Sequence, residues 1–198
     1  LTVTQIAKQS QGERIQLEAR PAFLQRQGLT PAQRGTILHS FMQFADFEAA
    51  ERDLPGETAR LVEKGFLTQE EAAALSLGKI EAFLRSPLYA RMKGAEELLR
   101  EYKFLYFLKA GEVDPELEGA FAQEEILIQG IADCLLFEPE GITIVDYKTD
   151  YAPAETLMER YHDQLRIYKD AISQAFSRPV RQCLLYALQL ERSIEILC

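Results

Sequence analysis

The sequence has few or none of several residue types that mark common protein classes. Among 198 residues there are no tryptophans, two histidines and three cysteines. The thiols of Cys134, Cys183 and Cys198 cannot all pair with one another, and none stands in a CxxC spacing. A disulfide framework, a zinc ribbon and a cysteine-ligated iron–sulfur cluster are therefore not expected. Unpaired thiols fit a reducing compartment, so the predicted location is the cytoplasm.

Long hydrophobic runs and an excess of positive charge are also missing. No stretch approaches the roughly 20 apolar residues that a membrane span requires, so no membrane association is expected. The formal net charge of −9 disfavours strong autonomous binding to duplex DNA, because such binding depends on neutralising phosphates. A negative charge still allows a catalytic site that receives DNA from another component.

Two further signals are missing. No GxxxxGK[ST] phosphate-binding loop occurs, so these residues cannot themselves be an ATPase. The first residues, LTVTQIAKQS, carry neither an initiator methionine nor a basic-then-apolar signal pattern. We therefore expect the chain to be a piece of a longer polypeptide.

The most informative feature that is present is a pair of strand-like segments joined by a turn. Residues 126–137 read ILIQGIADCLLF, and residues 141–150 read GITIVDYKTD. Both are rich in the β-branched and apolar residues that favour strands. Glu138-Pro139-Glu140-Gly141 between them is typical of a turn, so the two segments predict a β-hairpin.

The register of this hairpin brings charged residues together. If Phe137 lies opposite Ile142, then Asp133 lies opposite Asp146, and directly opposed side chains have Cβ atoms roughly 4.5–5.5 Å apart. Lys148 is two residues beyond Asp146 and points to the same face. Two carboxylates and an ammonium at one end of a hairpin predict a divalent-metal site with a charged helper.

The remaining pattern predicts a single α/β (α+β) domain with a central sheet. Residues 1–28 lack periodicity and predict a strap or linker before a domain at 29–198. Within that domain, about 50–95 carry no chemical motif and are interpreted as a helical insertion that buttresses or shapes the entrance to the site. The predicted helices cover Thr30 to about Phe47, 56–64, Thr68 to about Leu84, Pro87 to about Met92, and Ala154 to Phe176. The predicted strands cover Glu97–Leu108, Glu125–Phe137, Ile142–Lys148, Arg181–Leu190 and Ser193–Leu197.

Gly35 and His39 lie four residues apart in the predicted helix that starts at Thr30. A glycine inside a helix costs about 1 kcal/mol relative to alanine, which suggests that another backbone or a ligand comes close. A histidine on a mostly apolar helix is more often a satisfied core residue than a ligand. A predicted carboxylate pair nearby increases the odds that His39 is instead a metal ligand.

Four short motifs together resemble the RecB-like branch of the PD-(D/E)XK nuclease superfamily. They are GTILH (35–39), GIAD (130–133), VDYKT (145–149) and the QxxxY pair Gln164 and Tyr168, in the order of that family. The surrounding sequence is most similar to the C-terminal nuclease domain of AddA-type helicase–nuclease subunits. The resemblance implies a restriction-endonuclease-like core, with a central mixed sheet flanked by helices.

The resemblance also implies roles for individual residues. His39, Asp133 and Asp146 would be side-chain ligands of a metal ion, and the backbone carbonyl of Tyr147 would add a further oxygen. Lys148 would orient or help activate the attacking water and stabilise charge on the phosphate, so the predicted catalytic residues are Asp133, Asp146 and Lys148. Oxygen ligands suit Mg²⁺, and the single imidazole allows Mn²⁺ as a substitute.

Other residues have two interpretations each. Gln164 and Tyr168 are four apart on one helix face and would brace the site or contact DNA; alternatively Tyr168 is core and Gln164 a boundary residue. Glu101-Tyr102-Lys103 also fits an ExK pattern, but it lacks a partner acid across an inferable hairpin and no QxxxY helix follows it. The family resemblance implies that an acid before this strand can instead assist the site, so Glu101 is a second-tier candidate. His162 falls on the Asp163 side of its helix and is expected to be exposed.

The function implied by the resemblance is a Mg²⁺-dependent DNA exonuclease domain. It would hydrolyse a single strand delivered by a helicase, within a machine that processes double-strand breaks for recombinational repair. Its expected partners are the remainder of an AddA-type polypeptide and the AddB-type subunit of such a machine. One alternative is a non-catalytic nuclease-fold scaffold that binds DNA or another subunit. The other is a structural module whose acid pair is coincidental.

Overall fold

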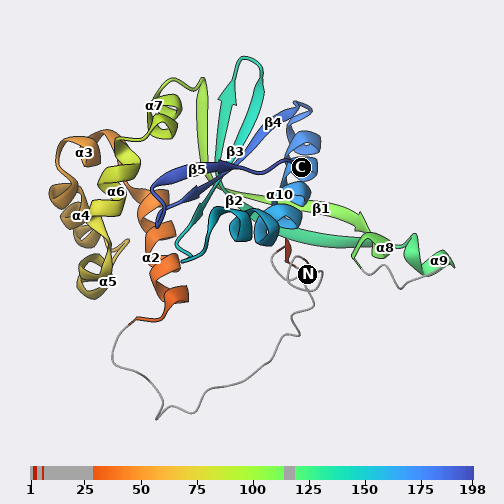
Figure 1. Ribbon diagram of the computed structural model, residues 1–198, viewed down its shortest axis with the longest axis horizontal. Coiled ribbons are helices and arrows are strands. Elements are labelled where there is room, and N and C mark those ends of the chain that lie inside the picture. Colours follow the sequence, from red (N-terminus) through yellow and green to blue (C-terminus); the bar gives the residue numbers. More distant parts are fainter. Residues whose placement is uncertain (1, 4–5, 7–28, 114–118) are drawn as a thin grey trace, which may run out of the picture.

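The computed structural model describes residues 2–3, 6, 29–113 and 119–198 (Figure 1). The strap predicted for residues 1–28 lies outside the described residues, except for Thr2, Val3 and Ile6. Val3 and Ile6 are buried in a core cluster with residues of the main domain. None of the helices in the described ranges is long and apolar enough to cross a membrane.

A five-stranded mixed sheet forms the centre of the molecule, as predicted. Its order is β1-β2-β3-β4-β5, and β3 and β4 run parallel while the other neighbouring strands are antiparallel. The parallel pair is connected by α10 (Ala154–Phe176), whose bounds agree with the prediction. The strands are β1 Glu97–Lys109, β2 Glu125–Glu138, β3 Gly141–Lys148, β4 Val180–Ala187 and β5 Arg192–Glu195.

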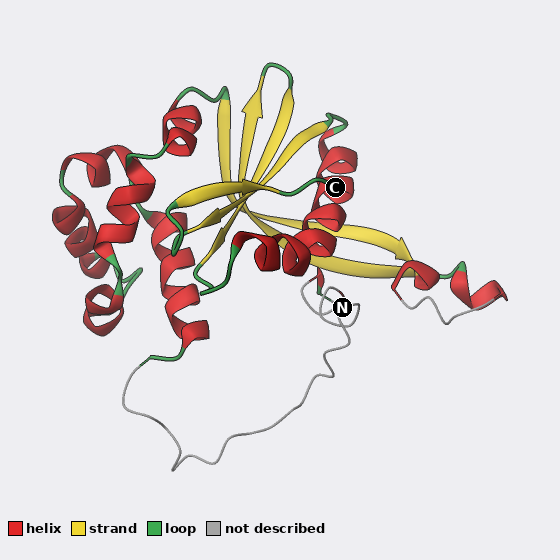
Figure 2. Cartoon of the chain, viewed as in Figure 1, coloured by secondary structure: helices red, strands yellow, loops and turns green. Residues whose placement is uncertain are grey.

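Two hydrophobic cores fill the space on the two sides of the sheet. In the first core, Leu165 and Ile172 of α10 are buried with Leu135 and Ile144 of the sheet. The second core joins the α2–α7 helices to alternate strand residues. Figure 2 shows α10 and the α2–α7 group on different sides of the strands. The other helices are α2 Pro31–Phe44, α3 Phe47–Arg52, α4 Leu54–Glu63, α5 Gln69–Ala74, α6 Leu77–Leu84, α7 Pro87–Lys93, α8 Ala110–Val113 and α9 Gly119–Ala122.

The segment predicted as a helical insertion is part of the second core. Phe83 of α6 lies at its centre, with ring centroids 5.6 Å from Tyr147 of β3, 5.0 Å from Tyr186 of β4 and 5.8 Å from Tyr89 of α7. Aromatic contacts of this kind stabilise a core beyond simple area burial. The 50–95 helices therefore cover one face of the sheet.

The first helix begins as predicted but ends earlier. Thr30 and Gln33 form the predicted capping box, in which each side chain accepts a hydrogen bond from the backbone N–H of the other. The helix was expected to reach Phe47, and this was wrong, because α2 ends at Phe44. Arg100 of β1 donates hydrogen bonds to the carbonyls of Met42 (3.0 Å) and Ala45 (2.6 Å) and so satisfies the helix end.

The single helix predicted from Thr68 to Leu84 is also wrong. The predicted capping box of Thr68 and Glu71 is present, but α5 ends at Ala74 and α6 starts at Leu77. Leu75 adopts an extended conformation (φ −64°, ψ 134°) and packs partly against the second core. Tertiary packing of one leucine thus overrides the helix propensity of an alanine-rich segment.

Beyond the sheet, β1 and β2 continue as a two-stranded ribbon with α8 and α9 at its tip (Figure 1). Where the ribbon leaves the sheet, Gly130 lies directly opposite Phe104. A Cβ at Gly130 would stand 2.3 Å from the Phe104 ring, which is buried and packs edge-on against Tyr168. The glycine of the GIAD motif therefore makes room for an aromatic ring across the strand pair.

We expect Gly130→Ala to lower the free energy of unfolding by about 1–3 kcal/mol, because the Phe104 ring must move inside a packed core. Thermal or urea unfolding measures the change. Gly78→Ala is the matched control, since nothing lies within 4 Å of the Cβ at this exposed helix position. It should be neutral or stabilising by up to about 1 kcal/mol. Equal stability of Gly130→Ala and the unsubstituted chain would contradict this account.

A second connection between the helices and the sheet is made by Arg91 of α7. Its guanidinium donates to both carboxylate oxygens of Glu138 (2.6 and 2.7 Å), to Oγ1 of Thr143 (2.7 Å) and to Oε1 of Gln182 (2.5 Å). One planar side chain thus joins α7 to three neighbouring strands. The hydrogen bonds from Arg91 hold the pKa of Glu138 below its usual value, although partial burial opposes this.

We expect Arg91→Lys to destabilise the fold by about 1 kcal/mol at pH 7, because an ammonium cannot replace the two-pronged contact. The pKa of Glu138 is lowered in the folded state, so its contribution is present above the unfolded pKa of about 4.3 and is lost as the pH falls through the folded value. The difference in free energy of unfolding between Arg91→Lys and the unsubstituted chain should therefore become smaller in acid. Urea unfolding between pH 7 and 3 measures this difference. Arg85→Lys, at a largely exposed arginine, is the control and should show little change.

Candidate active site

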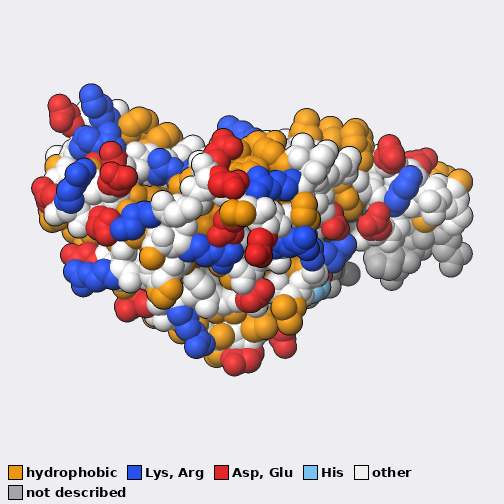
Figure 3. Space-filling view, turned by 90° about the horizontal axis from the view of Figure 1, so that it is seen from above, with side chains coloured by type: hydrophobic (Ala, Val, Ile, Leu, Met, Phe, Trp, Pro, Cys, Tyr) orange, Lys and Arg blue, Asp and Glu red, His pale blue; other side chains and the backbone are white. Residues whose placement is uncertain are grey.

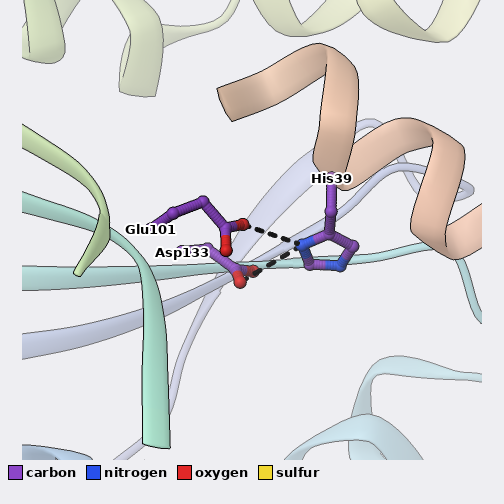
Figure 4. A group of neighbouring side chains, drawn as sticks. All are labelled: His39, Glu101 and Asp133. Carbon is purple, nitrogen blue, oxygen red and sulfur yellow. Dashed lines mark ion pairs between the residues drawn. The ribbon is translucent and has the colours of Figure 1, made fainter. Parts of the chain in front are cut away.

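The candidate site lies where the start of the ribbon meets α2. His39 of α2 points at two carboxylates of the sheet, Glu101 of β1 and Asp133 of β2 (Figure 4). Its Nδ1 atom is 3.2 Å from Oδ1 of Asp133 and 3.8 Å from Oε1 of Glu101. One potential ligand atom from each residue lies within 4.8 Å of the others. An imidazole and two carboxylates at this separation form a suitable donor set for a divalent metal ion.

The hairpin that carries the predicted acid pair has the predicted register. Phe137 pairs with Ile142, and the ladder continues to Cys134 and Val145. The same register puts Asp133 and Asp146 at the next position. There, Oδ2 of Asp133 accepts a hydrogen bond of 2.8 Å from the backbone N–H of Tyr147. The Asp133 side chain therefore closes the end of the hairpin with one oxygen and faces His39 with the other.

Asp146 is buried and forms an ion pair with Lys148, which is only partly exposed. The Lys148 Nζ atom is 2.5 Å from Oδ2 of Asp146, and the side-chain amide of Gln164 donates to Oδ1 at 3.2 Å. Lys148 also lies over the ring of Tyr161, with Nζ 4.5 Å from the centroid. The sequence placed Lys148 on the same face as Asp146, and the structure brings the two side chains into contact.

Burial and neighbouring charges set the ionisation of these groups. Burial raises the pKa of Asp146, and the attraction of the Lys148 ammonium opposes that rise. The pKa of Lys148 is raised because Asp146 and Asp133 outweigh the effect of burial. For His39, burial lowers the pKa, but hydrogen bonds to Asp133 and Glu101 have the larger combined effect and raise the pKa to about 10. Positive charge on His39 and Lys148 therefore lies beside the carboxylates, and ligation of a metal ion by His39 requires that the imidazolium first lose its proton.

Glu101, a second-tier candidate from the sequence, lies in the candidate cluster with His39 and Asp133. Which acid lies across from it could not be inferred from the sequence. The ladder pairs Arg100 with Cys134 and Tyr102 with Ala132, which leaves Glu101 and Asp133 between them as the residues that face His39. Glu101 has a φ of 53°, an uncommon value for a non-glycine residue and one that occurs at functional sites.

The other predicted residues occupy neighbouring positions. Asp146 contacts Lys148 and Gln164, while the candidate cluster itself contains His39, Glu101 and Asp133. The side chain of Tyr147 is buried in the second core. Its backbone N–H is held by Asp133.

The two residues of the QxxxY pair have different contacts. Gln164 is buried and bonds to Asp146, which matches the bracing interpretation. Tyr168 is also buried, with its ring 5.1 Å from Phe104, which matches the core interpretation. His162, expected to be exposed, has a half-exposed side chain beside Asp163, at 3.1 Å.

One cleft of about 1480 Å³ is lined by the residues of the candidate site, namely His39, Glu101, Asp133, Asp146, Lys148, Gln164 and Tyr168. Its walls come from α2, the start of the β1–β2 ribbon, the end of β3 and the first half of α10. On the face drawn in Figure 3, acidic and basic side chains are interspersed and no broad positive area is seen among the described residues. This distribution is in keeping with the net charge of −9.

The mixed sheet with flanking helices is the PD-(D/E)XK nuclease fold, and the charged cleft lies at the edge of that sheet. A family model described as the PD-(D/E)XK nuclease superfamily matches residues 11–194. The chain belongs to this superfamily, as the four motifs predicted.

Curated relatives, each named as the A-type subunit of an ATP-dependent helicase/nuclease, are similar to nearly the whole chain. Identity is 35% over 182 residues for the protein of Clostridium botulinum (strain 657 / Type Ba4), covering 89% of this chain and 14% of the relative. It is 37% over 181 residues for Geobacillus kaustophilus (strain HTA426), covering 85% and 14%. It is 37% over 175 residues for Acetivibrio thermocellus, covering 86% and 14%. The chain thus spans 14% of the length of these relatives.

We expect Gln164→Leu to destabilise the chain by about 1–3 kcal/mol, because it leaves Oδ1 of the buried Asp146 without its hydrogen-bond donor. Gln174→Leu, at an exposed position of the same helix, is the matched control and should change stability by less than about 0.5 kcal/mol. Urea unfolding of both variants measures the difference. If Gln164→Leu were as stable as its control, the hydrogen bond between Gln164 and Asp146 would contribute nothing to the free energy of unfolding.

Proposed function

We propose that this chain is a metal-dependent nuclease domain that hydrolyses phosphodiester bonds of a DNA strand. The observation that supports the proposal best is the meeting of His39, Glu101 and Asp133 beside the Asp146–Lys148 pair, in one cleft of a PD-(D/E)XK fold. These side chains come from α2, β1, β2 and β3. They therefore meet only when the helix and the three strands have packed together.

The residues of the cleft fit a divalent cation. His39, Asp133 and Asp146, with the backbone carbonyl of Tyr147, are the ligands that the family resemblance assigns, and the position of Glu101 adds a fifth candidate. Carboxylate and carbonyl oxygens favour Mg²⁺, and the imidazole allows Mn²⁺. When bound, such an ion lowers the pKa of water and polarises a phosphoryl oxygen.

The protein's own side chains would supply the remaining chemistry. Lys148 is a largely buried ammonium held 2.5 Å from Asp146, which fixes a positive charge in the cleft before any substrate arrives. A pre-positioned charge stabilises the negative charge that grows on a phosphate without a cost of reorganisation. Lys148 would also orient the attacking water, and Gln164 would hold Asp146 in position. The catalytic residues in this proposal are Asp133, Asp146 and Lys148.

The relatives suggest a setting for this activity. Because much longer relatives carry the name of an ATP-dependent helicase/nuclease, residues 29–198 would be the nuclease domain of an AddA-type polypeptide. The motor would lie in the remainder of that polypeptide, and its partner would be of the AddB type. Such a machine would digest single strands as an exonuclease during repair of double-strand breaks by recombination, in the cytoplasm. A domain of net charge −9 benefits from a motor that delivers its substrate.

The first test is degradation of end-labelled single-stranded DNA with Mg²⁺ or with EDTA. We expect cleavage that requires the metal and falls about 100-fold or more in Asp146→Asn, because a charge of the metal site is lost. Glu101→Gln should lower cleavage by about 10- to 100-fold if Glu101 holds or orients the metal. Asp170→Asn, in a half-exposed residue of α10, is the control and should cleave at the parental rate.

Each result leads to a distinct conclusion. Cleavage that survives Asp146→Asn would place the chemistry elsewhere or in a contaminant. An unsubstituted chain that binds Mn²⁺, seen as a rise in melting temperature, but never cleaves DNA would favour the non-catalytic scaffold. Cleavage by Glu101→Gln at the parental rate would show that Glu101 neither holds nor orients the metal.

A further inference from the structure

One aromatic side chain at the cleft stands almost entirely in solvent. Tyr151 lies in the loop between β3 and α10, three residues after Lys148, and lines the same cleft as the acidic cluster. Its exposed fraction is 88%, against 68% for Phe121 in α9 at the tip of the ribbon. Burying an aromatic ring is favourable, so a ring kept in water at the mouth of a charged cleft is available to a ligand.

The loop that carries Tyr151 is fixed on both sides of it. On one side, Asp150 accepts hydrogen bonds from Arg160 and from the hydroxyl of Tyr161, both at 2.9 Å. On the other side, Ala152 packs against the first core. The backbone is therefore held by α10 and the core, and the ring is presented to the cleft without a large loss of loop entropy on binding.

The chemistry around Tyr151 selects among possible ligands. The floor of the cleft is charged and suits a phosphate near a metal ion. Its walls also carry exposed apolar side chains, Leu105 of β1 and Ile131 of β2. A nucleic-acid strand has this same division into charged backbone and flat apolar bases. Aromatic side chains bind bases of any sequence by stacking, provided that the base is not already stacked in a duplex.

We propose that Tyr151 is a stacking site for one nucleobase of a single-stranded DNA, close to the phosphodiester in the catalytic cleft. The inference rests on the proposed nuclease function and adds to it a residue that holds the strand. Tyr151 would act in binding and would leave the chemical step to the residues of the metal site. It also gives the site a preference for unpaired bases that the negative surface cannot supply.

The lack of tryptophan makes a direct test possible. Tyr151→Trp creates a single tryptophan in the chain, and its fluorescence should be quenched in a saturable way by oligothymidylate in EDTA, where no cleavage occurs. Phe121→Trp, on the far end of the ribbon and outside the cleft, is the matched control and should respond little. A DNA duplex whose two ends are each closed by a non-nucleotide linker has no unpaired bases, and it should also give little quenching.

Affinity gives the second measurement. By fluorescence anisotropy of labelled oligothymidylate, Tyr151→Ala should bind about 5- to 100-fold more weakly, as expected for the loss of one stacked base. Tyr151→Phe should bind like the parent, because the ring is retained, and so should Phe121→Ala. In the cleavage assay, Tyr151→Ala should raise KM and leave kcat nearly unchanged.

The outcomes separate this inference from the proposed function. Unchanged Tyr151→Trp emission, or parental affinity of Tyr151→Ala, with cleavage intact would overturn the stacking site and leave the nuclease. Equal weakening by Tyr151→Phe would show that the hydroxyl matters and would also overturn it. Quenching by the closed duplex equal to that by single strands would reject the preference for unpaired bases. No binding of single strands by the unsubstituted chain would overturn the stacking site, whereas the nuclease proposal is decided by the metal-dependent cleavage assay.

Discussion

The two oxygens of Asp133 join the fold to the candidate site. One accepts the backbone N–H of Tyr147 and so fixes the end of the β2–β3 hairpin, and the other faces His39 of α2. A slip of one residue in that hairpin would turn Asp133 and Asp146 to opposite faces of the sheet. The register of the β2–β3 pair therefore decides whether Asp133 and Asp146 face the same side of the sheet.

The site also imposes a cost that the rest of the molecule must offset. Three carboxylates, one ammonium and one imidazolium lie close together and largely out of water, and buried ion pairs of this kind add little net stability. The two hydrophobic cores on either side of the sheet supply the compensation. The second core matters most in this respect, because the aromatic cluster around Phe83 fixes the strand that carries Asp146 and Lys148. The α2–α7 helices thus support the site from the face opposite α10.

Features encoded by near neighbours in the sequence were predicted well. The bounds of α10, the turn after Phe137 and the two capping boxes each depend on residues only a few positions apart. The predictions that were wrong involve distant partners. The carbonyls at the early end of α2 accept hydrogen bonds from Arg100, which is 55 residues or more away along the chain, and Leu75, where the predicted helix breaks, packs against a core shared with the sheet.

The sequence by itself determined the superfamily, the β2–β3 hairpin with its two aspartates and Lys148, and the helix that carries His39. Each of these depends on a short motif or on a pattern among residues close together in the chain. Only the tertiary structure decided that Glu101 belongs with His39 and Asp133. The β1–β2 pairing that brings it there spans a connection from Lys109 to Glu125 with no short turn to fix the register. The fixed, exposed position of Tyr151 is likewise tertiary, since it depends on contacts that Asp150 makes with side chains of the following helix. Local chemistry specifies elements, and long-range packing specifies which side chains share a cleft.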